Sequence, residues 1–554
     1  MNPRVLTACI VLSCPGLISK LAIADDHIAE LQAAAIGDGA AEFAHWGTKP
    51  DRYTHWRTHS NRLIPVYTFG TANNSGGANL DHYAGSNSAY RTEDGVRRLY
   101  GRVPENTVNP DATWMDQTNI ADLQRAAVAA GKKHIFLVVF DGMDWNTTQA
   151  AAIHNEQAVS YSSGRGSGTH FQNYDADGSS QFGFMVTSPH NNGTTVDVDS
   201  QTVENPGGKV SGGYDASIAG TAPWKSPTDA GYLIAMPADG NSKHAYTDSA
   251  SSATSMTAGI KTYNASINIG PGGEKAVTIA HELQDVGWAV GAVSSVPISH
   301  ATPAAAYAHN VSRNDYQDIS RDLLGLPSVS HPDQPLQGLD VLVGGGVGRT
   351  GDKGPKQGAN YESGNVYLAD SDLKAVSLQN QGRYVTAIRT AGISGSELLQ
   401  AAASKAATGG YNLLGFFGVG PYNAHLPFQT ANGDFAPVPG NRKRAEEYSA
   451  EDISENPNLA ECTHAALKVL QSRKTNFWLM VEAGDVDWAN HDNNLDNSIG
   501  AINSGDAAVR VVTDWVEQHS NWDDALLIVT ADHGHMLTVL QPESLVTPTG
   551  PEAE

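Results

Sequence analysis

The chain has 554 residues, of which 40% are hydrophobic and 17% are charged, a composition that allows a large buried core. Its formal net charge is −24, so its surface does not attract nucleic acid or anionic lipid. No sustained apolar run reaches the length of a membrane-spanning helix, and we therefore expect no membrane span. The same charge repels phosphate at long range. An anion site here therefore needs local positive charge, which bound metal cations would supply.

Residues 1–24 have the order of a secretory signal. Arg4 precedes a short apolar stretch at residues 6–18, and residues 22–24, Ala-Ile-Ala, form a small-x-small cleavage pattern. We expect this segment to be removed and the protein to be secreted or periplasmic. A buried first helix is the alternative.

The three cysteines add one restriction. Cys9 and Cys14 lie in the expected signal, where lipidation of one of them is a further alternative. After cleavage only Cys462 remains, and a single thiol excludes both an internal disulfide and a cysteine-based zinc site.

The first continuous apolar run along the chain is residues 132–140, KKHIFLVVF. Such a run is typical of a strand buried in a parallel sheet, and it puts Asp141 at the carboxyl end of that strand. Residues 155–245 are rich in Gly, Ser, Asn, Asp and Thr, so we expect a surface insertion with few regular elements there. A second insertion is expected at about residues 314–440.

From residue 276 onward, expected helices and strands alternate. The helices are residues 276–286, 458–472 and about 498–519, and the strands are residues 288–294, 340–343, 413–417, 477–482 and 525–531. Strands separated by helices imply right-handed crossovers and a parallel sheet covered on both faces. We therefore predict a single α/β domain over residues 25–554. Its fold would be a three-layer α/β/α sandwich with a large, mostly parallel central sheet.

Side chains that can bind metals follow three of these strands. Asp141 follows the strand at residues 132–140. Glu482 ends the strand at residues 477–482 and is followed by Asp487 and His491, and Asp532 and His533 follow the strand at residues 525–531. In a parallel sheet the carboxyl ends of the strands form the usual site edge. Carboxylate and imidazole ligands suit Zn²⁺, and an all-oxygen set suits Mg²⁺. Unrelated helix caps and surface histidines are the alternative.

Ser249 begins a stretch of small residues after Asp248. The N-terminus of a helix at this point would favour a phosphate group or a serine alkoxide. Taken alone, however, either residue is more simply a helix cap. Arg313 follows later and can hold two phosphate oxygens in a bidentate fork, but a lone arginine is more often a surface charge.

Together these segments resemble the alkaline phosphatase family. FDGM at 140–143, TDSASSAT at 247–254, HATPAA at 300–305, VEAGDVDWANH at 481–491 and TADHGH at 530–535 stand in the family's order. The resemblance implies hydrolysis of small phosphate monoesters through a phosphoserine intermediate, at a site with two Zn²⁺ and one Mg²⁺. A homodimer is a further expectation.

The resemblance also implies a role for each matched residue. Ser249 would be the nucleophile, and Arg313, oriented by Asp248, would clamp the phosphoryl oxygens. Three sets of ligands follow: Asp141, Asp532 and His533 for one zinc, Asp487 and His491 for the other, and Glu482 and Thr302 with bridging Asp141 for magnesium. His300, two residues before Thr302, stands at a position that varies in the family. It would enter the third site and change its metal preference, with Zn²⁺ or Co²⁺ as alternatives to Mg²⁺.

The family's last zinc ligand is a histidine well beyond the DHGH motif, but no histidine follows His535 here. Residues 59–70, HSNRLIPVYTFG, resemble the family's C-terminal segment, and residues 114–120 resemble its closing stretch. We therefore predict a circular permutation in which residues 50–125 correspond to the family's C-terminal portion and His59 completes the zinc site. His55 is the fallback ligand, and a missing third ligand is the alternative.

Three other functions fit these residues less well. Sulfatases of the same superfamily need a Cys or Ser in a C/S-x-P-x-R motif, and none occurs near Ser249. Related phosphodiesterases often use threonine and lack the set of Glu482, Thr302 and Arg313, so diester hydrolysis would be a secondary reaction. An inactive secreted protein that binds metal or phosphate is the alternative from another class.

Overall fold

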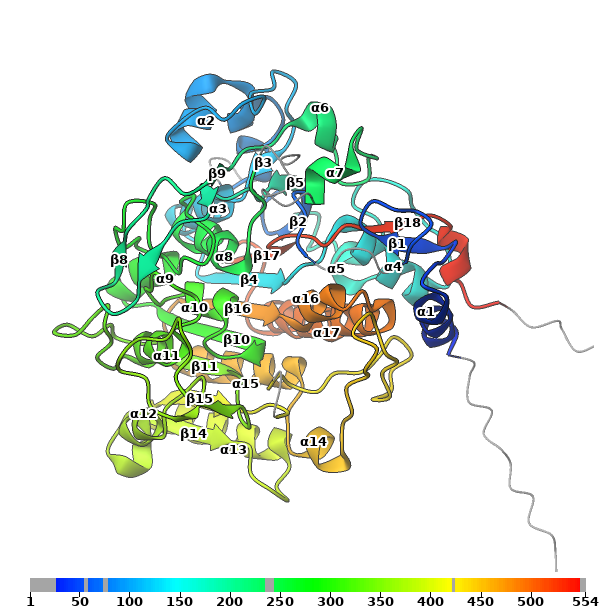
Figure 1. The fold of residues 1–554 in the computed structure, drawn as a ribbon. Coiled ribbons are helices and arrows are strands. Elements are labelled where there is room, and N and C mark those ends of the chain that lie inside the picture. The colour runs from blue at the N-terminus through cyan, green and yellow to red at the C-terminus, as the bar shows by residue number, and fades with distance from the viewer. Residues whose placement is uncertain (1–25, 54–57, 73–77, 235–243, 421–423, 549–554) are drawn as a thin grey trace, which may run out of the picture.

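A ten-stranded sheet organises the protein (Figure 1). The structure is a computed structural model that describes residues 26–53, 58–72, 78–234, 244–420 and 424–548. The strand order is β14-β15-β11-β10-β16-β4-β17-β2-β5-β3. The strands are β2 (Ile64–Phe69), β3 (Met115–Asp116), β4 (His134–Phe140), β5 (Gln181–Val186), β10 (Ala289–Pro297), β11 (Val341–Gly345), β14 (Tyr384–Ile388), β15 (Asn412–Phe416), β16 (Phe477–Ala483) and β17 (Ala525–Ala531). β2 runs antiparallel to both of its neighbours, and the other neighbouring pairs are parallel.

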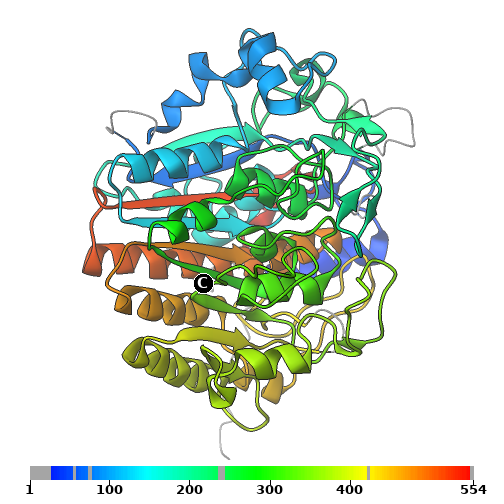
Figure 2. The ribbon, with the colours of Figure 1, turned by 90° about the vertical axis from the view of Figure 1, so that its left-hand side faces the viewer.

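Helices cover both faces of this sheet (Figure 2). One layer consists of α13 (Gly395–Gly409), α15 (Leu459–Ser472) and α17 (Leu495–His519), which pack side by side. The other layer consists of α3 (Asn119–Ala129), α8 (Ser249–Ala258), α9 (Ile279–Asp285) and α10 (Ala301–Ala305). The predicted three-layer α/β/α sandwich is therefore confirmed.

The other described elements lie around these layers. The helices are α1 (His27–Asp38), α2 (Glu93–Tyr100), α4 (Trp145–Glu156), α5 (His170–Asn173), α6 (Ala216–Ala219), α7 (Ala230–Ile234), α11 (Tyr316–Leu324), α12 (Asp370–Val376), α14 (Ala450–Ser454) and α16 (Asp485–His491). Short strand pairs are β1 (Ala44–Trp46) with β18 (Leu537–Val539), β6 (Asn191–Asn192) with β9 (Val210–Ser211), β7 (Val196–Asp197) with β8 (Thr202–Val203), and β12 (Thr350–Gly351) with β13 (Gly364–Asn365).

The register of the central strands positions the site. β4 and β17 are continuous apolar runs because helices cover both faces of the sheet, and all seven residues of β17 are buried. The two strands pair in parallel, with Phe140 opposite Ala531. Asp141 and Asp532 follow these paired residues and therefore leave the sheet side by side. β16 lies on the other side of β4, where Glu482 pairs with Val139.

Two predicted insertions are wrong in part. Residues 155–245 contain β5, which joins the central sheet between β2 and β3. Residues 314–440 contain β11, β14 and β15, which form one end of that sheet. β11 and β15 correspond to the strands expected at residues 340–343 and 413–417, whereas β14 was not expected. Gly- and Asn-rich loops surround β5 and β14, and both strands are short, so they contribute little to a pattern averaged over many residues.

Several expectations concern residues that the structure does not describe. The signal at residues 1–24, with Cys9 and Cys14, lies outside the described residues, and so does His55. Cys462 is described and is a free, buried thiol. Among the described residues, no helix combines the length and the apolar character needed to cross a membrane.

Candidate active site

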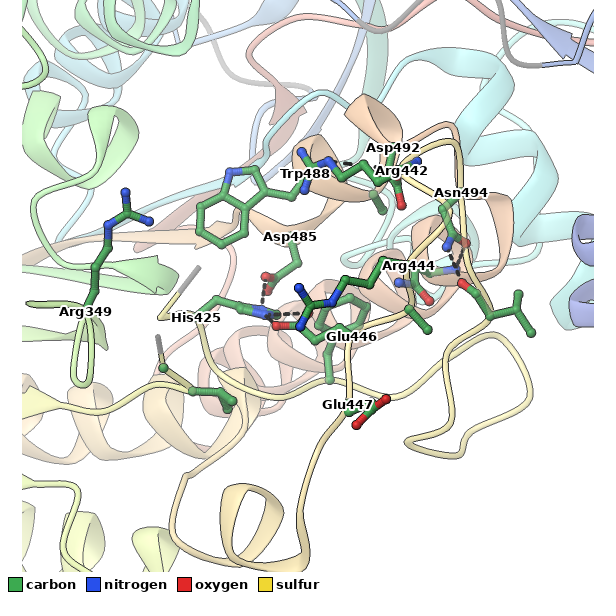
Figure 3. Close-up of a pocket in the computed structure, with 17 residues that line it drawn as sticks. Arg349, His425, Arg442, Arg444, Glu446, Glu447, Asp485, Trp488, Asp492 and Asn494 are labelled. Carbon is green, nitrogen blue, oxygen red and sulfur yellow. Dashed lines mark hydrogen bonds and ion pairs between the residues drawn. The ribbon is translucent and has the colours of Figure 1, made fainter. Parts of the chain in front are cut away.

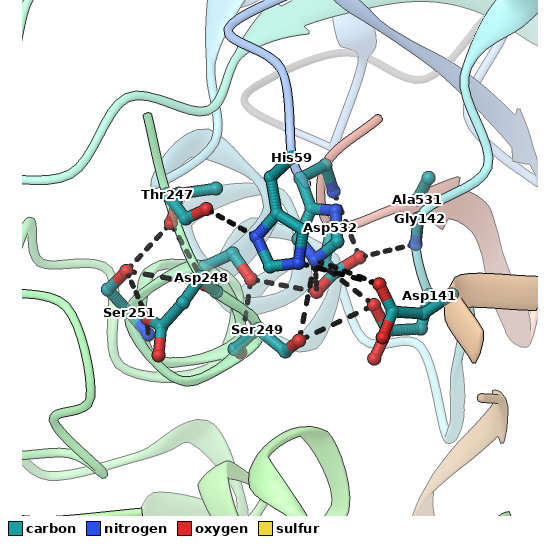
Figure 4. Close-up of polar contacts among 12 residues, drawn as sticks. His59, Asp141, Gly142, Thr247, Asp248, Ser249, Ser251, Ala531 and Asp532 are labelled. Carbon is teal, nitrogen blue, oxygen red and sulfur yellow. Dashed lines mark hydrogen bonds and ion pairs between the residues drawn. The ribbon is translucent and has the colours of Figure 1, made fainter. Parts of the chain in front are cut away.

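Ser249 is the first residue of α8, and Asp248 caps that helix. The Asp248 carboxylate accepts a hydrogen bond from the backbone N–H of Ser251 at 3.0 Å. The capping role therefore falls on the aspartate, which leaves the serine hydroxyl directed into the site. Ser249 Oγ lies 3.5 Å from Asp141 Oδ1 and 3.4 Å from His533 Nε2 (Figure 4).

Asp141, Asp532 and His533 form a buried group of metal-type ligands. His533 Nε2 lies 3.2 Å from Asp141 Oδ1 and 3.4 Å from Asp532 Oδ2. Burial and the nearby Asp487 carboxylate raise the pKa of Asp141 well above its usual range. Burial and Asp141 raise the pKa of Asp532 to about 7. Buried carboxylates that oppose each other's ionisation are stabilised by a divalent cation, so this donor set fits a zinc-type ion.

Asp532 is held in place by neighbours that sequence reasoning missed. Its carboxylate accepts hydrogen bonds from the backbone N–H of Gly142 at 2.9 Å and from the Ser252 hydroxyl at 3.0 Å. Ser252 lies on the first turn of α8, so the helix that carries Ser249 also fixes a candidate ligand. A serine among many small residues carries no local pattern that would have revealed this contact.

A second group gathers around Asp487. Its Oδ1 atom lies 3.4 Å from His491 Nε2, 3.5 Å from His59 Nε2 and 2.6 Å from His535 Nε2. Burial by itself would raise the pKa of Asp487, but His491 and the hydrogen bond from His535 hold it well below its usual range. Asp487 is therefore an ionised carboxylate among imidazole nitrogens. Asp487 and His491 are four residues apart on α16 and share one face of that helix.

His59 offers this group a nitrogen in a fixed tautomer. Its Nδ1 atom lies 2.8 Å from the backbone carbonyl oxygen of Thr247 (Figure 4). A carbonyl only accepts, so Nδ1 carries the hydrogen and the lone pair is on Nε2. His59 Nε2 lies 3.3 Å from His491 Nε2, and the His59 ring stacks on His533 with centroids 3.6 Å apart. His59 Nε2, His491 Nε2 and Asp487 Oδ1 thus lie within 3.5 Å of one another.

Glu482 and Thr302 are the residues predicted to hold the third metal. Glu482 Oε1 and Thr302 Oγ1 are buried without a hydrogen bond of normal geometry in the described part of the chain. Burial raises the pKa of Glu482 to about 8, against a hydrogen bond from Ser294. Buried oxygens that lack partners suit a hard cation such as Mg²⁺.

His300 packs against Trp488, the residue that follows Asp487. Its ring contacts the Trp488 ring edge-on, with centroids 5.6 Å apart. Burial and the Arg313 charge lower its pKa to about 3, so the ring is a neutral imidazole. The entry of His300 into the third metal site stays a prediction.

Arg313 is fixed beside the nucleophile by Asp248. Its Nη1 atom donates to Asp248 Oδ2 at 3.0 Å, and its backbone N–H donates to the carbonyl of Ala265 at 2.8 Å. The backbone N–H of Ala265 in turn donates to Asp248 Oδ2 at 3.0 Å. Burial would raise the pKa of Asp248, but Arg313 lowers it below its usual value, so the pair is ionic. The predicted orienting role of Asp248 is consistent with this geometry.

A cavity of about 640 Å³ lies beside α16 (Figure 3). It is lined by Asp485, Trp488 and Asp492, which fall on the face of the helix away from Asp487 and His491. Across this cavity His425 bridges two carboxylates, with Nδ1 2.6 Å from Asp485 and Nε2 2.8 Å from Glu446. These carboxylates raise the pKa of His425 well above its usual value despite burial. The bridge therefore anchors α16, which carries two candidate metal ligands.

The sequence profile of one protein family, described as alkaline phosphatase, matches residues 223–546, more than half of the chain. The chain belongs to the alkaline phosphatase family. The matched range contains Ser249, Arg313 and the candidate ligands from Glu482 to His533. His59 and Asp141 lie outside it.

Curated relatives in the family match part of this chain. It is 28% identical to Alkaline phosphatase 3 of Bacillus subtilis over 290 residues, which cover 52% of this chain and 49% of the relative. It is 29% identical to the alkaline phosphatase of Escherichia coli over 305 residues, which cover 54% of this chain and 60% of the relative. The chain thus matches about half to three fifths of the length of these proteins.

Solved alkaline phosphatase structures are also similar. The cold-active enzyme from a psychrophilic Shewanella is 21% identical, with a TM-score of 0.41 over 73% of this chain and 68% of that one. The enzyme from the Antarctic bacterium TAB5 is 19% identical, with a TM-score of 0.42 over 73% of this chain and 80% of that one.

Proposed function

We propose that the protein hydrolyses phosphate monoesters, with Ser249 as the nucleophile. The observation that carries this proposal is the setting of Ser249. Ser249 is the first residue of α8, and its hydroxyl lies within hydrogen-bond range of Asp141 and His533. The Arg313 side chain forms an ion pair with Asp248, the residue before Ser249. The nucleophile, the Arg313 guanidinium that would bind phosphate and the N-terminus of α8 therefore lie close together.

Metal ions belong to this proposal because the donor atoms fit them. Asp141, Asp532 and His533 would hold one zinc, and Asp487, His491 and His59 the other. Glu482, Thr302 and Asp141 would hold magnesium. When bound, the cations would lower the pKa of the serine hydroxyl and neutralise charge on the reacting oxygens.

The protein's own groups define two displacement steps. Arg313 holds two phosphoryl oxygens in a bidentate fork, and backbone N–H groups at the start of α8 face the third. Ser249 Oγ gives up its proton and forms a bond to phosphorus as the ester bond breaks, and the departing alkoxide takes up a proton and leaves as the alcohol. Water then attacks the phosphoserine, the bond from phosphorus to Oγ breaks, and inorganic phosphate leaves with Ser249 regenerated.

The circular permutation is part of the same proposal. We infer that residues 50–125 take the place of the family's C-terminal portion. β2 follows His59 and lies antiparallel beside β17, whose carboxyl end carries Asp532 and His533. The side chain of Gln117, in the stretch that resembles the family's closing segment, donates to the carbonyl of Asp532 at 2.8 Å. Both contacts support a shared origin of this segment with the family's C-terminal part.

We also propose that residues 1–24 direct export, so that the enzyme works outside the cytoplasm and takes up its metals there. N-terminal sequencing of protein recovered from the culture medium or periplasm tests this. A mature chain that begins at Asp25 is the expected result, and a retained Met1 would contradict it.

A chromogenic phosphate monoester at alkaline pH tests the main proposal. We expect hydrolysis by metal-replete protein and its loss after chelation. Sulfate esters should not react, and a phosphodiester should react more slowly than the monoester. Protein with all metals confirmed by elemental analysis but without monoester hydrolysis would instead support the metal- or phosphate-binding alternative.

A further inference from the structure

A second set of metal-type side chains meets in the region between α10 and β11. His309 follows α10, Asp322 lies on α11, and His331 lies in the connection from α11 to β11. His309 Nδ1 lies 3.0 Å from His331 Nε2, and His331 Nε2 lies 3.9 Å from Asp322 Oδ2. The three donor atoms all lie within 4.8 Å of one another. None of these residues takes part in the catalytic proposal.

The tautomer of His309 directs a lone pair into this group. Its Nε2 atom lies 2.8 Å from the backbone carbonyl oxygen of Ala276, so Nε2 carries the hydrogen. The lone pair on Nδ1 then points toward His331. An imidazole that donates one N–H to a backbone carbonyl and presents the other nitrogen is the usual form of a metal-binding histidine.

A neighbouring ring and a neighbouring ion further restrain the histidines. The His281 ring stacks on His309, with centroids 5.1 Å apart and planes 18° apart. His281 Nδ1 accepts from the backbone N–H of Thr278, so it is not a ligand and only orients His309. The Lys275 ammonium donates to the Ser330 carbonyl, next to His331.

Asp322 supplies the negative charge of the group. It is completely buried, accepts a hydrogen bond from the Ser328 hydroxyl on Oδ1 at 2.5 Å and one from the His309 backbone N–H on Oδ2 at 2.9 Å. A cation beside Oδ2 would balance the charge of this carboxylate, and imidazole nitrogens with a carboxylate oxygen are the usual ligands of such a cation.

We propose that His309, Asp322 and His331 bind one divalent transition metal of the zinc class. Two nitrogens and one oxygen suit Zn²⁺ or Co²⁺ better than Mg²⁺ or Ca²⁺. The His331 side chain is 14% exposed, so water can reach a fourth coordination position. The ion links the loop that carries His331 to α11, through Asp322, and to the segment after α10, through His309. This inference does not depend on the proposed phosphatase activity.

Metal counting in a matched pair of variants tests the site. His331→Ala removes a partly exposed ligand and leaves the catalytic residues unchanged, and His464→Ala removes an exposed histidine on α15 as the control. Equilibrium dialysis against ⁶⁵Zn²⁺ should give one equivalent more in the wild type and in His464→Ala than in His331→Ala. The affinity for that equivalent should fall by at least about tenfold in His331→Ala.

Two further readouts separate this site from the catalytic centre. With Co²⁺ in place of zinc, the visible absorption of the wild type should exceed that of His331→Ala, while kcat/KM for a monoester stays equal in both. Anomalous scattering at the zinc edge should give a peak between His309 and His331. The proposal would be overturned if the wild type and His331→Ala bound equal numbers of zinc ions while circular dichroism showed that both were folded. The two histidines would then simply share a hydrogen bond.

Discussion

His59 Nε2 lies 3.3 Å from His491 Nε2, although 432 positions separate the two residues in the chain. The antiparallel pairing of β2 with β17 creates this proximity, because His59 enters β2 at the end of the sheet where β17 finishes. The isolated bridge between Ser60 and Gly534 continues the pairing past the strands. An N-terminal histidine therefore lies among candidate ligands from the C-terminal half of the protein.

His59→Ala should weaken one of the two zinc sites. The variant removes the nitrogen that faces Asp487 and His491, so we expect zinc affinity at that site to fall by more than about tenfold, with a parallel loss of kcat/KM at limiting zinc. Titration of apo-protein with zinc in the presence of a competing chelator measures this. His464→Ala is the matched control. Full zinc content and activity in His59→Ala would exclude His59 as a ligand.

Ser249→Ala should abolish the covalent step. Removal of the nucleophile is expected to lower kcat by about 10⁴-fold or more, because the remaining groups bind and polarise the ester but cannot form the intermediate. Mass spectrometry after an acid quench should find a phosphorylated Ser249 in the wild type. Phosphate on any other residue under the same quench would be inconsistent with the assignment.

Arg313→Ala should remove the bidentate clamp on the phosphoryl group. We expect kcat/KM to fall by about 10² to 10³-fold, and Arg313→Lys should restore only part of it because an ammonium cannot form the fork. Inhibition by inorganic phosphate should weaken in parallel. The exposed Arg97, replaced by alanine, serves as the control, and an Arg313→Ala variant with the phosphate affinity of the wild type would contradict the role.

Chelation should lower stability as well as activity. Metal ions that bind only the native state stabilise it in proportion to the logarithm of their concentration, and the buried carboxylates Asp141, Asp532 and Glu482 repel one another without them. We expect a clear fall in Tm after treatment with EDTA, recovered by Zn²⁺ and Mg²⁺ together. A calorimetric scan that is the same before and after chelation would contradict a metal centre at these residues.

His425→Gln should destabilise α16. Glutamine keeps the approximate size of the side chain but removes the charge that pairs with Asp485 and Glu446, and breaking a buried ionic bridge in this way costs about 3–5 kcal/mol. The free energy of unfolding in urea measures the effect. The double variant with Glu446→Gln should recover part of the loss, whereas equal stability of the wild type and His425→Gln would show that the bridge does not hold the helix.

The sequence by itself determined the layered fold and most of the candidate site. Continuous apolar runs at residues 134–140 and 525–531 are local features that specify buried parallel strands, and Asp141 and Asp532 had to follow them at one edge of the sheet. It did not reveal β5 or β14. Short strands in polar surroundings are decided by the neighbours they pair with.

Only the tertiary structure decided which donor atoms meet. The sequence offered Asp248 and Ser249 as equal candidates for the cap, and the hydrogen bond from Ser251 to Asp248 separated their roles. It suggested His59 from a resemblance, but the Thr247 carbonyl that fixes its tautomer comes from 188 positions away. His309 and His331 gave no local pattern at all. Hydrophobic periodicity is a property of neighbours along the chain, whereas a ligand set depends on angles and distances that exist only after the sheet has formed.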